Sequence, residues 1–286
     1  MKYLLCRPLG GFNDTLNQIY KCYEYCITYN RTLLLDTEYN NFISSSFDNY
    51  FTFINKNNIN VIYNSDAIYK IINNNKFTVF PEILEDVLYS YTAKYINDGF
   101  YYKNIMLRLD FTRNYEQELI VHNDCGIDCN SLNMISLLQI NDWLIDIIIK
   151  RYNLIEKPYI SIHIRNTDYK TDYINLYYEY KNIIDNNNIF LATDSKEVLD
   201  YFINLQLNNN FYNFIECLND ENKPIHQKNT INNKNQVMID TICDLIILSL
   251  SSNLLYPERH YGFTNLARSL FMNKTIVANL LKNKLI

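Results

Sequence analysis

Short apolar runs alternate with longer amphipathic segments along much of the chain. Near the N-terminus, the apolar run 2–8 leads into a glycine-containing turn at 9–14. The next segment, 15–29, repeats its apolar residues at the spacing of one helical face, and the run 31–36 ends in a carboxylate. This order predicts a strand, a turn, a helix and a strand, which is the pattern of a βαβ unit with parallel strands.

Over the following hundred residues the pattern is weaker. Three further runs are typical of strands, at 60–63, 77–80 and 118–122. The tyrosine-rich segments between them fit helices and loops equally well. A polar, glycine-containing segment at 122–130 is the best candidate for a linker, and helical periodicity follows it from 132 to 149.

The part of the chain after this linker again alternates strands and helices. Its strand-like runs are 159–165, 188–193, 211–216, 253–257 and 275–279. Helical patterns lie between them, at 195–205, 235–252 and 264–273. Strands this apolar are typical of a parallel sheet that helices cover on both faces. The sequence therefore predicts an α/β protein of two domains, residues 1–125 and 126–286, which would face each other across a cleft at the carboxyl ends of their strands.

Charge and composition narrow the classes of partner. The chain has 286 residues, of which 48% are apolar and 20% are charged, and its formal net charge is −5. These values are ordinary for a globular protein, and the negative charge argues against nucleic acid or an anionic membrane surface as the main partner. An anionic ligand would therefore need a local cluster of donors.

The N-terminal residues and the cysteines indicate the cellular compartment of the protein. No apolar run approaches the roughly 18 residues that span a bilayer, and the apolar core near the N-terminus is too short for a signal peptide. Seven cysteines, an odd number at irregular spacing, indicate reduced thiols. Cys125 and Cys129 form one CxxxC without a second pair, so we expect no zinc site. These features predict a cytoplasmic protein.

The run 159–165 ends in His163 and Arg165, with Asp168 three residues later. His163 and Arg165 are two residues apart, so they lie on one face of the strand at its carboxyl end. An arginine in this position offers a planar fork of donors that suits phosphate oxygens. The alternative is that Arg165 and Asp168 form a surface salt bridge and that His163 is an ordinary core residue.

The following strand also ends in polar residues. Thr193 and Asp194 lie at the end of the run 188–193, just before a predicted helix. At this edge of the sheet, Asp194 could accept hydrogen bonds from a sugar or a base. Capping of the helix by Asp194 or Ser195 is the alternative.

Two features of the last predicted helices also suggest a ligand. Asp240 and Asp244 lie one turn apart on an otherwise apolar helix, so we expect at least one of them to face a cleft. Gly262, Phe263 and Thr264 fall at a predicted helix start, where backbone N–H groups and the helix dipole attract an anion. Thr264 could instead be an ordinary N-cap.

The turn at 9–14 supplies the fourth group of candidates. Gly10 and Gly11 let the backbone approach a ligand closely, and Asn13 and Asp14 place an amide and a carboxylate at the helix entrance. Helix capping would explain the same pair. The chain contains neither G-x-G-x-x-G nor G-x-x-x-x-G-K-[ST], so a dinucleotide fingerprint and a P-loop are both absent from the sequence.

Taken in order, these four groups resemble the fucosyltransferases that use GDP-fucose, namely the protein O-fucosyltransferases, the α1,6-fucosyltransferases and the bacterial-type α1,2-fucosyltransferases. GGFNDTLNQ, followed by YNRTLLLD, resembles the family's Gly-rich turn, helix and strand. IHIRNTDY is similar to its His-x-Arg signature, and FLATDS to its Ala-Thr-Asp strand end. DLIILSLSSNLLYPERHYGFTNLA resembles its final helix, strand and Ser/Thr-rich turn.

The resemblance implies a GT-B-like fold, in which two Rossmann-like domains face each other across a cleft. The GDP-sugar would bind the C-terminal domain and the acceptor the N-terminal one. Arg165 would hold the β-phosphate, His163 would position the nucleotide, and Asn13 would lie beside the reacting sugar. The other donor-binding residues that the resemblance implies are Gly10, Gly11, Phe12, Thr193, Asp194, Asp244, Gly262, Phe263 and Thr264.

Two departures from the family leave the sugar open. The chain has Asn-Asp-Thr at 13–15 and Tyr-Gly-Phe-Thr at 261–264, where the family often has Gly-Asn-Gln or a Ser-Ser-Phe-type run. Asn166 stands where the α1,6 and α1,2 enzymes often carry a second arginine. Fucose is the expected sugar, and another GDP-linked sugar is the alternative. A non-catalytic nucleotide-sugar-binding protein of the same fold is a further alternative.

The expected reaction follows from the available charges. The chain has no Asp-x-Asp motif, with which many transferases hold a metal ion. Arg165 and the N–H groups of residues 262–264 are another means of stabilising a diphosphate leaving group, and the loss of one such donor costs on the order of a hundredfold in rate. We therefore expect a metal-independent, inverting transfer to a glycan or protein hydroxyl, without a cofactor. Asp14 is the first candidate for the base, and Asp168 is the second.

Two other classes of protein are disfavoured. A Rossmann-type methyltransferase or oxidoreductase would need the glycine fingerprint that the sequence lacks. A purely structural interaction protein would fit the high tyrosine content, but it would leave His163, Arg165 and Asp194 as three unrelated features.

Overall fold

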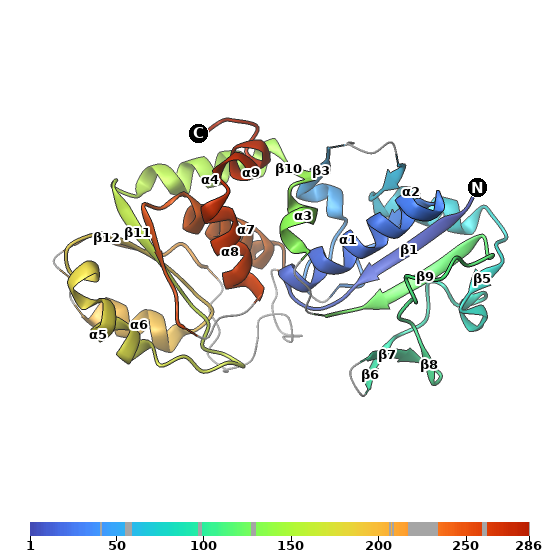
Figure 1. Cartoon of the computed structure of the whole chain (residues 1–286), viewed down its shortest axis with the longest axis horizontal. Helices are drawn as coiled ribbons and strands as arrows, with labels where there is room; N and C mark the ends of the chain where they lie inside the picture. Colours follow the sequence, from blue (N-terminus) through green and yellow to red (C-terminus); the bar gives the residue numbers. More distant parts are fainter. Residues whose placement is uncertain are drawn as a thin grey trace. The chain divides into compact units, whose positions relative to one another are not determined.

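The computed structural model describes residues 1–40, 42–54, 59–96, 99–126, 130–205, 207, 209–216, 234–258 and 262–285. The chain forms two compact units, Met1–Gln139 and Ile140–Ile286 (Figure 1). Each unit has a parallel sheet and a buried apolar core of its own, which is the organisation expected of a domain.

A five-stranded sheet forms the centre of the first unit, in the order β4-β2-β1-β9-β5, with every pair parallel. Its strands are β1 (Tyr3–Pro8), β2 (Thr32–Leu35), β4 (Val61–Ile62), β5 (Val79–Phe80) and β9 (Leu119–Asp124). β1, the helix α1 (Phe12–Tyr29) and β2 form the predicted βαβ unit. The three further strands predicted in this region correspond to β4, β5 and β9.

The helix α1 covers one face of this sheet. Its buried residues include Leu16, Ile19 and Cys26, which recur at helical spacing, and Cys22 contacts Cys6 of β1. The helix ends at Asn30, whose backbone is left-handed with φ 50° and whose N–H donates to the Cys26 carbonyl. Asparagine adopts this conformation more readily than most residues, so the helix ends there.

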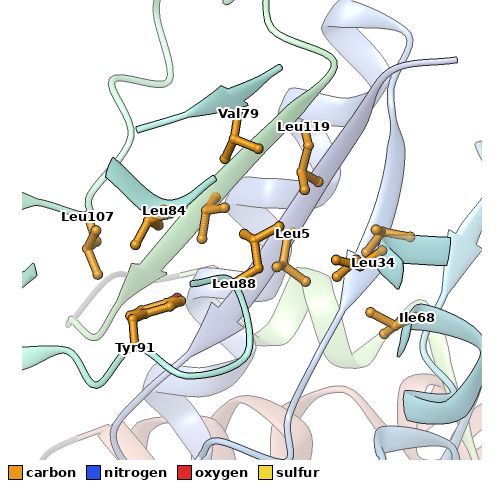
Figure 2. Close-up of a cluster of buried hydrophobic side chains, with 11 residues drawn as sticks. Leu5, Leu34, Ile68, Val79, Leu84, Leu88, Tyr91, Leu107 and Leu119 are labelled. Carbon is orange, nitrogen blue, oxygen red and sulfur yellow. The ribbon is translucent and has the colours of Figure 1, made fainter. Parts of the chain in front are cut away.

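The opposite face carries an apolar core cluster of the unit (Figure 2). Leu5 of β1, Leu34 of β2 and Leu119 of β9 lie in it, and Ile68 of α2 (Ser65–Asn73) lies beside Leu34. Burial of each such side chain is worth about 1.5–3 kcal/mol. Because alternate residues of a strand share a face, the polar side chain of Arg7 lies at the same face as Leu5, at the carboxyl end of β1.

Smaller elements complete the first unit. β3 (Phe51–Phe53) pairs with β10 (Leu138–Ile140). A three-stranded antiparallel sheet consists of β6 (Lys94–Ile96), β7 (Gly99–Tyr102) and β8 (Ile105–Met106). The short helical elements are η1 (Phe47–Asn49), η2 (Glu82–Leu84) and α3 (Ser131–Ile135).

The segment predicted as a linker and helix is organised differently. Residues 122–124 belong to β9, and the periodic segment 132–149 is divided among α3, β10 and the start of α4 (Asp142–Leu154). Leu138 and Ile140 are buried on either side of a partly exposed Gln139, which is the alternation of a strand, and pairing with β3 stabilises it. The division of the chain into two compact units falls after Gln139, whereas the sequence pattern places a domain boundary at residue 125.

The second unit is built on a four-stranded parallel sheet in the order β13-β12-β11-β14. Its strands are β11 (Tyr159–Ile164), β12 (Asn188–Thr193), β13 (Phe211–Tyr212) and β14 (Asn253–Leu255). Its helices after α4 are α5 (Tyr173–Ile184), α6 (Lys196–Asn204), α7 (Lys234–Leu250), α8 (Gly262–Met272) and α9 (Lys274–Leu280).

One predicted strand of this unit is wrong. The run 275–279 lies in the helix α9, not in a strand. Its β-branched residues favour a strand, but Val277 and Leu280, which are three residues apart, are both buried, and the helix packs against α7 and α8. Tertiary packing therefore decides the conformation of this segment.

Helices cover both faces of the second sheet, as predicted. Ile160, Ile162 and Ile164 of β11 pack in one cluster with residues of α5 and α6. On the other face, the Tyr159 hydroxyl donates to the Ile247 carbonyl of α7 at 2.8 Å, and the Ser161 hydroxyl donates to the Leu248 carbonyl at 3.3 Å. By alternation, His163 lies on the α7 side of the sheet.

Candidate functional site

The candidate site of the second unit begins at Arg165, the first residue after β11. Its Nε and Nη2 donate to the two carboxylate oxygens of Asp168 at 2.8 and 2.7 Å. The guanidinium also lies 5.0 Å from the centre of the Tyr169 ring and 4.0 Å from Asp194 Oδ2. The surface salt bridge that the sequence left as an alternative is therefore present. The Arg165 side chain is 27% exposed, so it stays accessible to a ligand.

Asp194 holds the loop that carries Arg165. Its Oδ1 accepts a hydrogen bond from the Asn166 N–H at 2.8 Å, and its Oδ2 accepts one from the Thr167 hydroxyl at 2.7 Å. Burial raises the pKa of Asp194, while these two hydrogen bonds oppose the shift. Both carboxylate oxygens already have donors within the chain. Thr193 is buried as well, and its hydroxyl accepts from the Ser195 N–H at 3.3 Å.

His163 connects β11 to the first turn of α8. Its Nδ1 forms a hydrogen bond with the Thr264 hydroxyl at 2.8 Å, and its ring centre lies 5.1 Å from that of Phe263. Burial, together with the nearby positive charge of Arg165, lowers the pKa of His163 to about 3. The imidazole is therefore neutral near pH 7, and it holds the start of the helix against the strand.

A pocket of about 350 Å³ lies beside these residues, within the second unit. Arg165 and Thr264 both line it, so the structure brings together two of the residues that the sequence proposes for a diphosphate. The first N–H groups of a helix have no partner within the helix, and α8 begins at this point. The other lining residues are Asp168, Tyr169, Lys170, Thr171, Asp172, Asn175, Leu176, Glu179, Pro257 and Glu258.

The two aspartates of α7 have different surroundings. Asp240 accepts hydrogen bonds from Arg151 Nη2 and the Gln236 amide, each at 2.8 Å, and one from the Glu216 N–H at 3.0 Å. Asp244 is also buried, and its pKa is raised well above the ordinary value by desolvation and by the negative charge of Asp240. Neither of the two aspartates lines the pocket beside Arg165. Asp240 therefore has a structural ion pair.

The glycine turn of the first unit is tightly packed. Gly10 has φ +91°, and a Cβ at this position would lie 2.9 Å from Asp14 Oδ2 and 3.3 Å from Cys125 Cβ. Only glycine can adopt this positive φ and also fit so close to Asp14 and Cys125 without strain. Asn13 is buried in the first turn of α1, while Phe12 is buried and stacks on Phe51 at 6.0 Å. These contacts favour a packing role for Phe12.

Two ion pairs of the first unit were not predicted from the sequence. Arg7 is fully buried, and its Nε donates to Asp36 Oδ2 at 2.9 Å. Beside the glycine turn, Arg108 donates to Asp124, whose carbonyl accepts from the Leu9 N–H at 2.8 Å. Asp36 and Asp124 stand at the carboxyl ends of β2 and β9, and that position is the signal that could have located them.

Cysteines and acidic residues give no metal site in the described part of the chain. No group of three or more His, Cys, Asp or Glu side chains in those residues could hold a metal ion. Of the CxxxC pair, Cys129 lies outside the described residues, and burial raises the pKa of the Cys125 thiol to about 11. The described helices include none that is both long enough and apolar enough to cross a membrane.

Comparisons with known proteins identify the fold. No family model and no curated protein sequence matches the chain. Solved structures do match: the NodZ α-1,6-fucosyltransferase soaked with GDP-fucose has 16% identity and a TM-score of 0.60, with 94% of this chain and 92% of that chain covered. The fucosyltransferase NodZ from Bradyrhizobium has 15% sequence identity and a TM-score of 0.61, with the same coverage. POFUT1 in complex with GDP has 12% sequence identity and a TM-score of 0.60, with 94% of each chain covered.

The chain has the fold of these fucosyltransferases. The GT-B-like α/β class expected from the four sequence groups is thereby confirmed, and so is the resemblance to this superfamily at the level of fold. The match covers 94% of the chain, so it extends over most of both units.

Proposed function

We propose that the chain is a glycosyltransferase that transfers fucose from GDP-fucose to an acceptor hydroxyl, without a metal ion and with inversion at the anomeric carbon. The observation that carries this proposal is the pocket shared by Arg165 and Thr264 at the carboxyl edge of a parallel sheet. Ligands of open α/β sheets bind at that edge. The fold similarity to transferases whose structures contain GDP or GDP-fucose supports the choice of ligand.

In the proposed reaction, the acceptor oxygen bonds to the anomeric carbon of fucose while the bond from that carbon to the β-phosphate oxygen breaks. The electron pair of the breaking bond leaves with GDP, so negative charge builds up on the diphosphate. The Arg165 guanidinium and the N–H groups of the first turn of α8 would stabilise this charge from fixed positions. The hydrogen bond between His163 and Thr264 would hold the start of α8 at a fixed position relative to the end of β11, which carries Arg165.

The proton of the acceptor hydroxyl must pass to a base. Asp168 is disfavoured for this role, because both of its oxygens accept hydrogen bonds from Arg165. Asp14 stands in the first turn of α1, next to a glycine whose Cα has no room for a side chain. We therefore assign the base to Asp14, with Asn13 beside it as a polar contact to the sugar or acceptor.

A thermal-shift experiment tests the donor assignment. GDP should raise the melting temperature of the protein, whereas UDP and NAD should have little effect. Arg165→Ala should abolish the GDP shift, while Arg268→Ala, which removes an exposed arginine of the same unit outside the pocket, should keep it. Equal responses to all three nucleotides, or a full GDP shift in Arg165→Ala, would refute the assignment.

A turnover assay tests the reaction. The protein should consume GDP-fucose in the presence of an acceptor library, and EDTA should leave the rate unchanged. GDP binding without consumption of GDP-fucose would mean that the fold serves a non-catalytic nucleotide-sugar-binding protein. Faster consumption of another GDP-sugar would replace fucose while leaving the site assignment intact.

A further inference from the structure

A pocket of about 390 Å³ lies in the first unit, beside the apolar core of Figure 2. It is formed by the end of α2, the segment that leads into β5, and the turns after η2. Its volume falls within the range of roughly 300–1,000 Å³ that is common for small-ligand sites. None of the residues singled out in the sequence lines it. The lining residues are Ile72, Asn73, Asn75, Lys76, Phe77, Val79, Glu85, Asp86, Leu88, Tyr89 and Ser90.

The floor of this pocket is apolar and contains two fixed aromatic rings. Ile72, Val79 and Leu88 belong to the buried core. The Phe77 ring meets Tyr3 edge to face at 5.5 Å. The Tyr89 ring lies 4.8 Å from that of Tyr69, and its hydroxyl donates to the Tyr69 carbonyl at 3.1 Å. Rings held in this way offer a flat apolar surface at little cost in conformational entropy.

The rim of the pocket is polar, and four of its side chains have no hydrogen-bond or ion-pair partner among the described residues. The side chains of Asn73, Lys76, Glu85 and Asp86 are exposed and form no hydrogen bond or ion pair with another described residue. Together they provide amide and ammonium donors and carboxylate acceptors above an apolar floor. The three charged side chains sum to one negative charge, which disfavours an anionic ligand.

We propose that this pocket binds a neutral sugar unit, and that the acceptor of the proposed transfer is therefore a glycan and not a protein side chain. A sugar ring has one face of C–H groups, which suits the aromatic and aliphatic floor, and a rim of hydroxyls, which suits carboxylates and amides. A phosphorylated or sulfated ligand would meet Glu85 and Asp86. The choice of acceptor rests on the proposed function, whereas binding of the sugar does not.

One wall of the pocket is linked by a hydrogen bond to the carboxyl end of β1. The Leu88 carbonyl in its wall accepts a hydrogen bond from Arg7 Nη1, and Arg7 directly precedes the segment 8–14. Arg7 also lies 4.2 Å from the centre of the Tyr39 ring and pairs with Asp36, so this wall is fixed to the ends of β1 and β2. A glycan held in the pocket would thus be anchored to the unit that supplies the proposed base.

A glycan array tests this inference. The labelled protein should bind neutral oligosaccharides in preference to sialylated or sulfated ones. The double variant Glu85→Ala, Asp86→Ala should weaken binding of the best neutral glycan at least tenfold, as measured by calorimetry. Glu82→Ala, which removes an exposed carboxylate of the preceding turn outside the lining, is the matched control and should bind like the wild type.

The outcomes separate this inference from the proposed function. Stabilisation by GDP reports on the second unit and on the folding of each variant. A protein that GDP stabilises but that binds no neutral glycan would overturn the sugar pocket and leave the donor assignment standing. Binding that the double variant retains, or a preference for acidic glycans, would overturn it as well. Neutral-glycan binding lost in the double variant, without any GDP shift in the wild type, would support the pocket and refute the donor.

Discussion

Acidification should destabilise the first unit through His122. This residue of β9 is fully buried: its Nδ1 accepts from the Leu109 N–H at 3.2 Å, and its Nε2–H donates to Gln18 Oε1 at 2.9 Å. The ring is therefore held in its neutral form. Desolvation, with smaller contributions from Lys21 and Arg108, lowers its pKa from 6.5 to about 3. A second proton would have to sit on Nδ1, where an N–H group already points.

The sign of the effect follows from this shift. The folded state binds the proton less tightly than the unfolded state, so the contribution of His122 is complete above pH 6.5 and is lost as the pH falls toward 3. Each pH unit within that window costs about 1.4 kcal/mol. At pH 5 the unit should thus be about 2 kcal/mol less stable than at pH 8, whatever the precise folded pKa below 4.

Hydrogen exchange detected by mass spectrometry measures the change of stability with pH in each unit separately. Protection of β1 and β9 should fall between pH 8 and pH 5, after correction for intrinsic exchange rates. His122→Asn, which cannot titrate, should be less stable at pH 8 but should show a flatter pH dependence. The second unit is a poorer test, because the raised pKa of Asp244 opposes the lowered pKa of His163 there. Equal slopes in the wild type and His122→Asn would refute the reasoning.

Three further changes test the two candidate sites. Gly10→Ala should cost about 1–2 kcal/mol in the free energy of unfolding because of its positive φ, and more if Asp14 cannot move aside, as urea denaturation will measure. Thr264→Val should cost about 1 kcal/mol and reduce the GDP shift, whereas Thr264→Ser should restore both by keeping the hydrogen bond to His163. Asp14→Asn should lower kcat about a hundredfold without changing the GDP shift. An unchanged kcat would exclude Asp14 as the base. The same fall in kcat in Asp168→Asn would assign the role of base to Asp168.

Prediction from sequence succeeded where a strand is buried on both faces. The runs at 2–8, 31–36, 159–165 and 188–193 correspond to β1, β2, β11 and β12 within one or two residues at each end. A continuous apolar run bounded by polar residues has few other ways to be buried, and parallel strands follow from the helices between them.

Prediction from sequence failed where the residues of a short segment are compatible with both a helix and a strand. The helix α5 was not predicted, because its sequence YINLYYEYKNII is rich in tyrosine and isoleucine, which favour strands. Asp172, whose side chain accepts from the Asn175 N–H at 2.9 Å, marks the start of this helix and was the available signal. In α9 and β10, packing against distant elements decides the conformation, and no local pattern contains that information.

The site was partly predictable for a related reason. Residues at the carboxyl ends of parallel strands must gather at one edge, so Arg165 could be placed near Asp194 without knowledge of the structure. What each side chain contacts could not be inferred. Both oxygens of Asp194 accept hydrogen bonds from the loop after β11, and Phe12 packs against Phe51, which stands far along the chain.

The ion pair of Arg165 with Asp168 bears directly on the proposed donor site. The two side chains are 27% and 31% exposed, and an exposed pair of this kind is worth about 0–1 kcal/mol. A diphosphate bound as proposed would carry more charge than one carboxylate and would also contact the N–H groups at the start of α8. It would therefore displace Asp168 at small cost. Asp168→Asn should then bind GDP up to about fivefold more tightly, since it removes the competing anion. Weaker GDP binding in that variant, measured by calorimetry, would instead mean that Asp168 orients the guanidinium for the phosphate.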